Sequence, residues 1–232
     1  MTTRPPGRGR LAATAALFVL LAAGPSAHAG LMTFTASPYT GDPAGATVTF
    51  DDAVSPGSVR VTITVNPNPN IGDINGFFLN IGNETLLPGL SITGPQVTLV
   101  DKSANAVTSA GPGNNMNGEG VGPFDIGLRI GSPGIGKDDI QTTSFLLSDP
   151  DVTLTNEMFA GATTEDGDIF GLRLTSVGLP SSNRNGSSKL TNDSPPPPPL
   201  AQTPEPSTLV GLGTLSILGL LARRVSRPSS RA

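Results

Sequence analysis

The sequence predicts an all-β protein with a single antiparallel, jelly-roll-like β-sandwich. Residues 59–65 alternate Val or Ile with Arg or Thr, which is the two-residue period of a half-buried strand. Other short runs between residues 30 and 179 are rich in Val, Ile, Phe and Thr, which favour strands. Turn sequences such as Ser55-Pro56-Gly57 and Pro88-Gly89 separate these runs. Short strands joined by such turns are typical of a β-sandwich.

The expected strands leave little room for helix. We expect them at residues 31–36, 46–50, 59–65, 76–81, 90–92, 96–100, 124–130, 143–147, 152–155 and 169–177. Residues 155–160 suit a single helical turn, because Thr155 or Asn156 can cap it. Thr-x-Thr pairs recur without a constant period, so we interpret them as the polar faces of half-buried strands.

Residues 104–122 are rich in Gly and Asn, and Met116 has no apolar neighbour there. We therefore expect a long exposed loop in this segment. Long loops at the end of a sandwich often carry a binding site. A loop without a binding role is the alternative interpretation.

The N-terminus, residues 1–29, has the pattern of a secretory signal peptide. Three arginines precede an apolar run that is expected to be helical, and Ala27 and Ala29 form a small-x-small cleavage site. Cleavage by signal peptidase after passage through the translocon would leave Gly30 or Leu31 at the new terminus. A retained signal anchor is the alternative.

Residues 180–203 are expected to be a disordered linker that follows the exported domain at 30–179. The segment is rich in Ser, Asn and Pro and too poor in apolar residues to form a core. Its five consecutive prolines, Pro195 to Pro199, favour a short, stiff polyproline II spacer.

The C-terminal tail, residues 204–232, has three parts in a fixed order. They are Pro204-Glu205-Pro206, an uncharged segment of 16 residues at 207–222, and a basic end at 223–232 that begins with Arg223 and Arg224. As a helix the uncharged segment would span about 24 Å at 1.5 Å per residue. A bilayer core is about 30 Å thick, so the segment would be a marginal transmembrane helix. The arginines would hold its end in the cytoplasm.

This tail resembles the PEP-CTERM sorting signal of exported bacterial proteins. The resemblance implies that an exosortase-like membrane enzyme reads the tail during a transient stay in the inner membrane. The protein would then reach the cell surface or an extracellular exopolysaccharide matrix, as in a biofilm. A plain C-terminal tail anchor is the alternative. Residues 31–179 loosely resemble the β-domains that precede such tails, and this group carries no activity that transfers to particular residues.

The composition restricts the chemistry of the exported part. The chain has 14 Lys+Arg and 18 Asp+Glu, but seven of the basic residues lie in the signal and the tail. The remaining acidic surface would repel nucleic acid. The chain has no Cys, and its one histidine, His28, would leave with the signal peptide. Catalytic triads and zinc sites that need imidazole or thiol are therefore excluded. We expect no catalytic activity.

The densest acidic cluster surrounds Gly167. Glu165, Asp166 and Asp168 could surround a Ca²⁺ ion, because calcium takes several oxygen ligands. A solvated hairpin loop without metal is the alternative. No other cofactor is expected.

These observations favour a non-enzymatic surface or extracellular-matrix protein. A module that binds Ca²⁺ or glycan at the cell surface is the alternative. A glycoside hydrolase built on paired carboxylates is disfavoured, because the chain has no Trp and one Tyr to stack on sugars.

Overall fold

The computed structural model describes residues 30–118, 121–132, 134 and 136–192. The predicted signal peptide, the sorting tail and residues 193–203 of the predicted linker lie outside the described residues. None of the helices that the structure describes is long and apolar enough to cross a bilayer.

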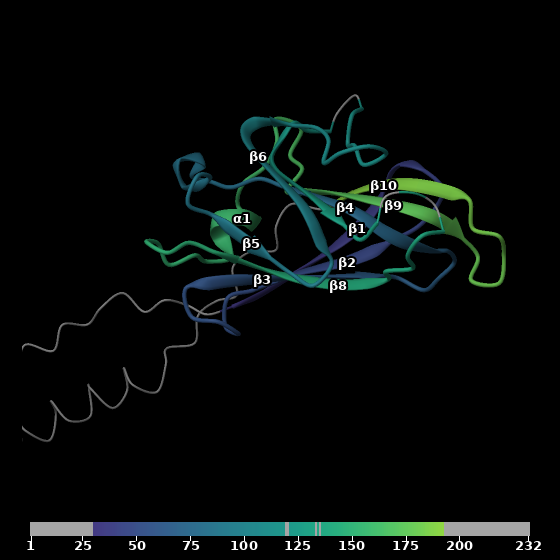
Figure 1. Ribbon diagram of the computed structural model, residues 1–232, viewed down its shortest axis with the longest axis horizontal. Helices are drawn as coiled ribbons and strands as arrows, with labels where there is room; N and C mark the ends of the chain where they lie inside the picture. Colours follow the sequence, from purple (N-terminus) through teal and green to yellow (C-terminus); the bar gives the residue numbers. More distant parts are fainter. Residues whose placement is uncertain (1–29, 119–120, 133, 135, 193–232) are drawn as a thin grey trace, which may run out of the picture.

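The regular secondary structure of the described chain is almost entirely β-strand, and all the strand pairings are antiparallel (Figure 1). In order they are β1 Leu31–Gly41, β2 Ala46–Asp51, β3 Ser58–Val65, β4 Ile71–Leu79, β5 Ser91–Thr93, β6 Val97–Val107, β7 Phe124–Ile130, β8 Thr142–Ser148, β9 Phe170–Gly178 and β10 Gly186–Asn192. A 3₁₀ turn, η1 Glu84–Leu86, and a short helix, α1 Glu157–Ala160, complete the described elements. The all-β, antiparallel prediction is confirmed.

All ten strands belong to one hydrogen-bonded sheet, in the order β5-β8-β3-β2-β1-β10-β9-β4-β7-β6. The sheet curls so that its two halves face each other. Phe77 on β4 and Phe145 on β8 stand far apart in this order, yet their ring centroids are 5.7 Å apart. The edge strands β5 and β6 are joined by residues 94–96 alone, so the sheet is nearly closed. The predicted division into two separate sheets is not observed.

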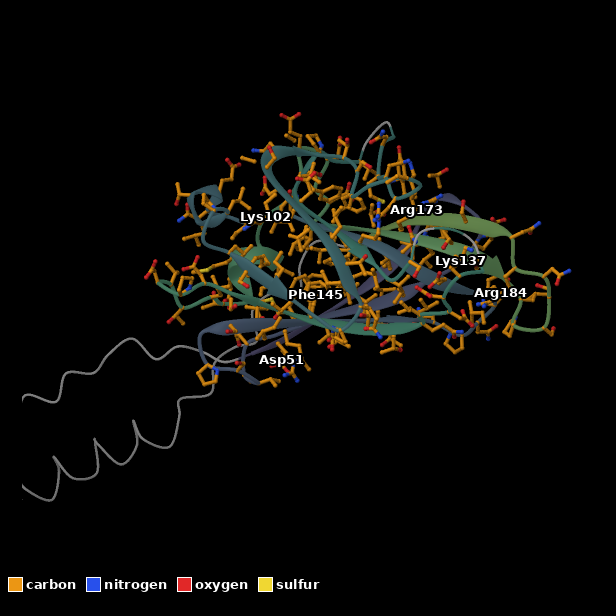
Figure 2. The ribbon with its side chains drawn as sticks, in the orientation of Figure 1. Asp51, Lys102, Lys137, Phe145, Arg173 and Arg184 are labelled. Carbon is orange, nitrogen blue, oxygen red and sulfur yellow. The ribbon has the colours of Figure 1, made fainter. Side chains whose placement is uncertain are left out.

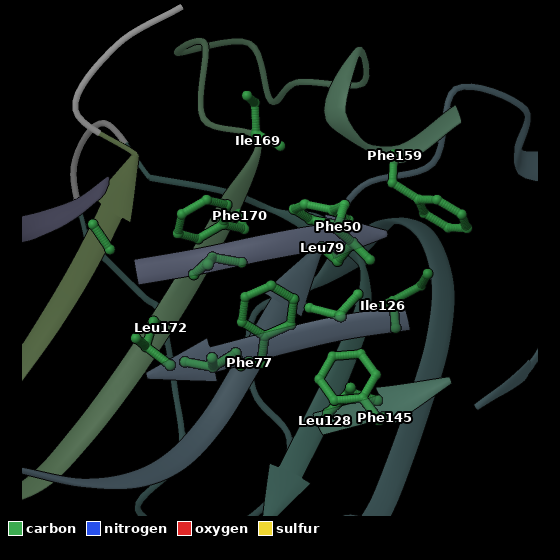
Figure 3. Packing of buried hydrophobic residues seen from close by; sticks show 14 of the residues in the cluster. Phe50, Phe77, Leu79, Ile126, Leu128, Phe145, Phe159, Ile169, Phe170 and Leu172 are labelled. Atoms are coloured by element: carbon green, nitrogen blue, oxygen red, sulfur yellow. The ribbon is translucent and has the colours of Figure 1, made fainter. Parts of the chain in front are cut away.

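The interior is filled by alternate side chains, as the two-residue period predicts. On β2 every second residue is buried, and the same alternation continues along most of β3. Phenylalanine rings from several strands meet at the centre (Figure 3). Phe77 stacks on Phe170 at 5.6 Å, and Phe34 meets Phe50 edge-on at 5.8 Å. Truncating one such ring to Ala typically costs about 3–5 kcal/mol.

The C-terminal strand corrects the predicted domain boundary. β10 lies within residues 180–203, which were expected to form a disordered linker, and that prediction is wrong for residues 186–192. The strand pairs with β1 on one side and β9 on the other, in the middle of the sheet. Its sequence is polar, and only Ser188 and Leu190 are buried. Backbone hydrogen bonds to both neighbouring strands therefore hold β10 in the sheet, although it buries few apolar side chains.

Residues 152–155 correct a second expectation. They form no strand, although Leu154 is buried and its N–H bonds to the carbonyl of Gly57 at 3.1 Å. The helical turn expected at residues 155–160 is confirmed as α1, which follows Asn156. The Asn156 side chain makes no capping bond to the helix and instead reaches the start of the described chain.

Candidate functional site: a cationic row beneath a covering loop

The predicted calcium ligands lie in a tight loop before β9. Glu165 and Asp166 are exposed, whereas Asp168 turns inward and is buried. Thr164 closes the loop, since its hydroxyl accepts from Asp168 N–H at 3.1 Å and its own N–H donates to the Asp168 carbonyl at 2.9 Å. Burial raises the pKa of Asp168, and the Asp166 carboxylate adds to the rise. Within the described ranges, no three acidic side chains come together as a group that could hold a metal ion.

Other acidic side chains cap the backbone. Asp149 Oδ1 accepts from the N–H groups of Asp151 and Val152, at 2.9 and 3.1 Å. Asp125 accepts from Ile81 and Asn105 at 2.9 and 2.7 Å. These bonds hold loops and strand ends in place, so they explain much of the acidic composition without a ligand. The predicted sorting and cleavage residues at 27, 29, 204–206 and 223–224 lie outside the described residues.

The structure instead brings three cations into one row on the outer face of the sheet. Lys189 on β10 lies opposite Arg173 on β9, which lies opposite Gly76 on β4, which lies opposite Arg129 on β7. Residues directly opposite in an antiparallel pair point to the same face. The chain neighbours Leu190, Leu172 and Leu128 fill the core, so the row faces outward. We call Lys189, Arg173 and Arg129 the cationic row. Arg173, its middle member, is labelled in Figure 2.

A loop at residues 108–118, here the covering loop, lies over this face. It folds back on itself, since Ser109 pairs with Asn115 and the Ala110 N–H donates to the Asn114 carbonyl at 2.9 Å. Met116 is buried, in contrast to the predicted exposure of this segment. It belongs to a small second core with Phe78, Val107, Ala110, Val121 and Phe124. The prediction failed because nearby apolar side chains, among them Val107, Val121 and Phe124, fold together with Met116, and Phe78 on β4 adds a partner distant in sequence.

Glycines on the sheet allow the covering loop to approach. A Cβ atom at Gly76 would overlap the carboxamide of Asn114. That carboxamide is buried and donates to the carbonyls of Asn75 and Leu128, both at 3.2 Å. A Cβ at Gly171 would lie 2.7 Å from Met116 Cε. Absent side chains thus leave the space into which the loop fits.

Within the part of the chain that the structure describes, the cations of the row lack anionic partners. In Arg129, Nε and Nη2 are buried and have no hydrogen-bond partner, and the same holds for Nε of Arg173. Arg173 Nη1 donates to the Ser188 carbonyl at 3.3 Å, and Lys189 Nζ donates to the Asn117 carbonyl. Among the described residues, no carboxylate lies within ion-pair distance of any of the three. Buried or half-buried cations without a partner are costly.

The pKa directions agree with this geometry. Burial lowers the pKa of Arg173. Burial, followed by repulsion from Arg173, lowers the pKa of Lys189. Both shifts mean that the surroundings disfavour the positive charge, because desolvation and a like charge raise the free energy of the charged form. An anion placed beside the row would raise both pKa values, because it would stabilise the charged forms of Arg173 and Lys189.

An aromatic ring stands at the β10 end of the row. Thr40 on β1 lies opposite Lys189, and its neighbour Tyr39 is exposed. A Cβ at Gly118 would lie 2.9 Å from Tyr39 Cε1, while Lys189 contacts Asn117. Ring and ammonium therefore border the same end of the covering loop. An exposed tyrosine beside cations suits a saccharide that carries acidic groups, because the ring offers an apolar face and a hydroxyl.

A repeated tripeptide in the sequence could have revealed this site. Gly127-Leu128-Arg129 and Gly171-Leu172-Arg173 both read Gly-Leu-Arg and both lie in strands. With a two-residue period, the leucine enters the core while the glycine and the arginine share the outer face. The repeat predicts two arginines on one face, but only the strand order shows that β4 alone separates them.

Two further features lie elsewhere. A pocket of about 370 Å³ is lined by Glu84, Leu87, Pro88 and residues 102–104. At the start of β4, Asp73 is buried and accepts from Ile140 N–H at 2.9 Å. Burial raises the pKa of Asp73 to about 6; the bond from Ile140 opposes this rise, and the charges of Asp138 and Asp139 add to it.

Comparison of the chain with protein-family models, with curated proteins and with solved structures finds no match in any of the three.

Proposed function

We propose that this chain is an exported, non-catalytic protein of the cell surface or extracellular matrix, held in an acidic exopolysaccharide through its cationic row. In this proposal the signal peptide directs export, and an exosortase-like enzyme processes the tail. The cationic row is the observation that supports this proposal most strongly. It contains three partly buried cations in a strongly acidic segment, and none of them has a carboxylate partner among the described residues.

The limits of the fold support the export part of the proposal. β1 begins at Leu31, directly after the predicted cleavage site, and β10 ends at Asn192, before the predicted tail. Removal of residues 1–29 and 204–232 would therefore leave all the described strands intact. β1 and β10 are antiparallel neighbours, so the chain enters and leaves the sheet toward the same end. A domain tethered through its tail would point its opposite end away from the membrane.

The chemistry of the row supports an acidic saccharide as the ligand. Guanidinium groups bind carboxylate and sulfate oxygens through charge-assisted hydrogen bonds, and lysine adds a point charge. Each contact at a partly exposed site is weak. A long polymer presents many identical groups, so a protein that dissociates from one group can rebind to another, and this rebinding would retain the protein in a matrix despite the weak contacts.

The absence of catalysis in this proposal follows from the available side chains. Between the predicted processing sites the sequence has no His and no Cys. Among the described residues, no carboxylate lies within ion-pair distance of the row, where it could act as an acid or base beside the cations. Lysine and arginine without such a partner bind anions but do not hydrolyse a glycosidic bond, which generally uses two carboxyl groups.

Binding to defined polysaccharides tests the proposal. We expect the protein to bind a polyuronate or a sulfated polysaccharide in low salt, to bind neutral dextran at least tenfold more weakly, and to lose affinity as salt rises. The separate polyuronate and sulfated samples distinguish the two anionic groups. Arg173→Gln and Lys189→Gln should each lower the affinity about fivefold, the equivalent of one charge-assisted contact.

Arg60→Gln is the matched control, because Arg60 is an exposed cation on β3, away from the row. It should leave the affinity within twofold. Equal binding to dextran and polyuronate, or an equal loss from all three variants, would rule out the row as the binding site.

A further inference from the structure

Gly30, the first residue of the described chain, is held by hydrogen bonds to both its N–H and its carbonyl. Gly30 N–H donates to Asp52 Oδ1 at 2.5 Å. The Gly30 carbonyl accepts from the Asn156 side chain at 2.6 Å and from Asp52 N–H at 3.3 Å. Both polar groups of one glycine are thus fixed by Asp52, which directly follows β2, and by Asn156, which precedes α1.

The carboxylate that faces Gly30 is buried and lacks a cation. Asp52 is 8% exposed, and its second oxygen, Oδ2, accepts from Asn156 N–H at 3.0 Å. Among the described residues, none of the cationic groups lies within ion-pair distance of Asp52. The site also holds unused acceptor capacity, since Oδ1 of Asn156 is buried without a donor. A buried carboxylate served only by neutral N–H groups would be stabilised by a positive charge.

We propose that cleavage between Ala29 and Gly30 supplies that charge. This inference rests on the proposed export. Water breaks the Ala29–Gly30 peptide bond: its oxygen adds to the Ala29 carbonyl, which leaves with the signal peptide as a carboxylate, and the Gly30 nitrogen becomes an α-amino group that is protonated near neutral pH. The new ammonium forms an ion pair with Asp52, so processing joins the mature N-terminus to the end of β2 and, through Asn156, to the segment before α1.

The geometry also selects between the two predicted termini. A chain that begins at Gly30 keeps all three bonds of this residue and adds a charge to one of them. A chain that begins at Leu31 loses these bonds and leaves Asp52 with Asn156 as its described partner. Gly30 is therefore the expected mature terminus. A charge-assisted hydrogen bond is roughly twice as strong as a neutral one.

The ion pair is tested with two forms of the protein that differ by one residue. One begins at Gly30 and the other at Ala29, and both retain everything that follows. The form with the free Gly30 amine should melt about 2–6 °C higher, because an amide in the second form replaces the ammonium. Asp52→Asn should abolish this difference. The neighbouring exchange Asp51→Asn, at a less buried carboxylate, should preserve it.

Equal melting temperatures, or a difference that survives Asp52→Asn, would overturn the proposal. A second measurement applies even if Asp52→Asn does not fold. The α-amine of the form that begins at Gly30 should react with an acylating reagent at least tenfold more slowly when folded than in urea; equal rates would also overturn the ion pair.

The mass of the exported protein separates this inference from the proposed function. A terminus at Gly30 supports both. A processed protein that begins at Leu31 would overturn the ion pair and leave export standing. Retention of residues 1–29 would contradict the signal-peptide cleavage itself.

Discussion

At the scale of single residues, Asp73 is the side chain that we expect to change the free energy of unfolding most with pH. Its pKa is about 6 in the folded protein, above the ordinary value of 3.8, because burial disfavours the carboxylate. Between these values the folded state binds more protons than the unfolded state. Asp73 therefore contributes stability that is fully present below pH 3.8 and is lost as pH rises to about 6.

Asp73→Asn tests this contribution. Asn keeps an oxygen that can accept from Ile140 N–H but cannot ionise. We expect the variant to be more stable than the parent at pH 7–8, by about 1–3 kcal/mol, and to lose the decline between pH 4 and 6. Chemical denaturation at a series of pH values measures both. Asp101→Asn, at an exposed carboxylate on β6 that does not act on Asp73, is the control. An unchanged pH profile in Asp73→Asn would contradict the assignment.

Single residues also show where sequence reasoning stops. Arg129 and Arg173 are recognisable as outward-facing from their Gly-Leu-Arg context. The unpaired guanidinium nitrogens of these two arginines depend on strand pairing and on Asn114 and Gly111, which lie close to the row only because the covering loop folds over it. Burial and missing hydrogen bonds are properties of the folded arrangement, so residue type and spacing alone could not predict them.

At the scale of elements, β10 separates what periodicity predicts from what it misses. β3 was predictable because apolar and polar residues alternate along it and one face is buried. β10 has the sequence GSSKLTN, and Leu190 is its one buried apolar side chain. Hydrophobic patterning gives almost no signal there. The strand is specified by its two neighbours, β1 and β9, whose backbone groups it pairs.

Truncation tests this role of β10. A chain covering residues 30–192 should unfold cooperatively, whereas a chain ending at residue 185 should not fold, because β1 and β9 would both lose a partner in the middle of the sheet. Circular dichroism during heating distinguishes the two. A cooperative transition of similar midpoint in the shorter chain would show that β10 is dispensable.

The burial of Met116 in the covering loop was not predicted, for a related reason. Its Gly and Asn content is typical of exposed loops, and that composition outweighed its two apolar residues, Ala110 and Met116. In the structure, small residues on both sides allow close contact between loop and sheet, with Gly171 beneath Met116. Gly and Asn can therefore form a closely packed loop when the sheet beneath it carries glycines and leaves space for it.

At the scale of the whole molecule, charge and chain direction support one account. The segment between the predicted processing sites is acidic overall, yet three of its cations share the cationic row. The described chain enters and leaves the sheet toward the same end, because β1 and β10 are antiparallel neighbours. The all-β class followed from short strands and turns, whereas closure of one curled sheet required pairings that the sequence does not encode locally.

The most direct measurement is the intact mass of the protein recovered from the extracellular polysaccharide fraction of cells that produce it. The account predicts a chain that begins at Gly30 and lacks the residues after Pro204-Glu205-Pro206. A chain found only in the membrane fraction and still ending at Ala232 would indicate a plain tail anchor and would contradict the account.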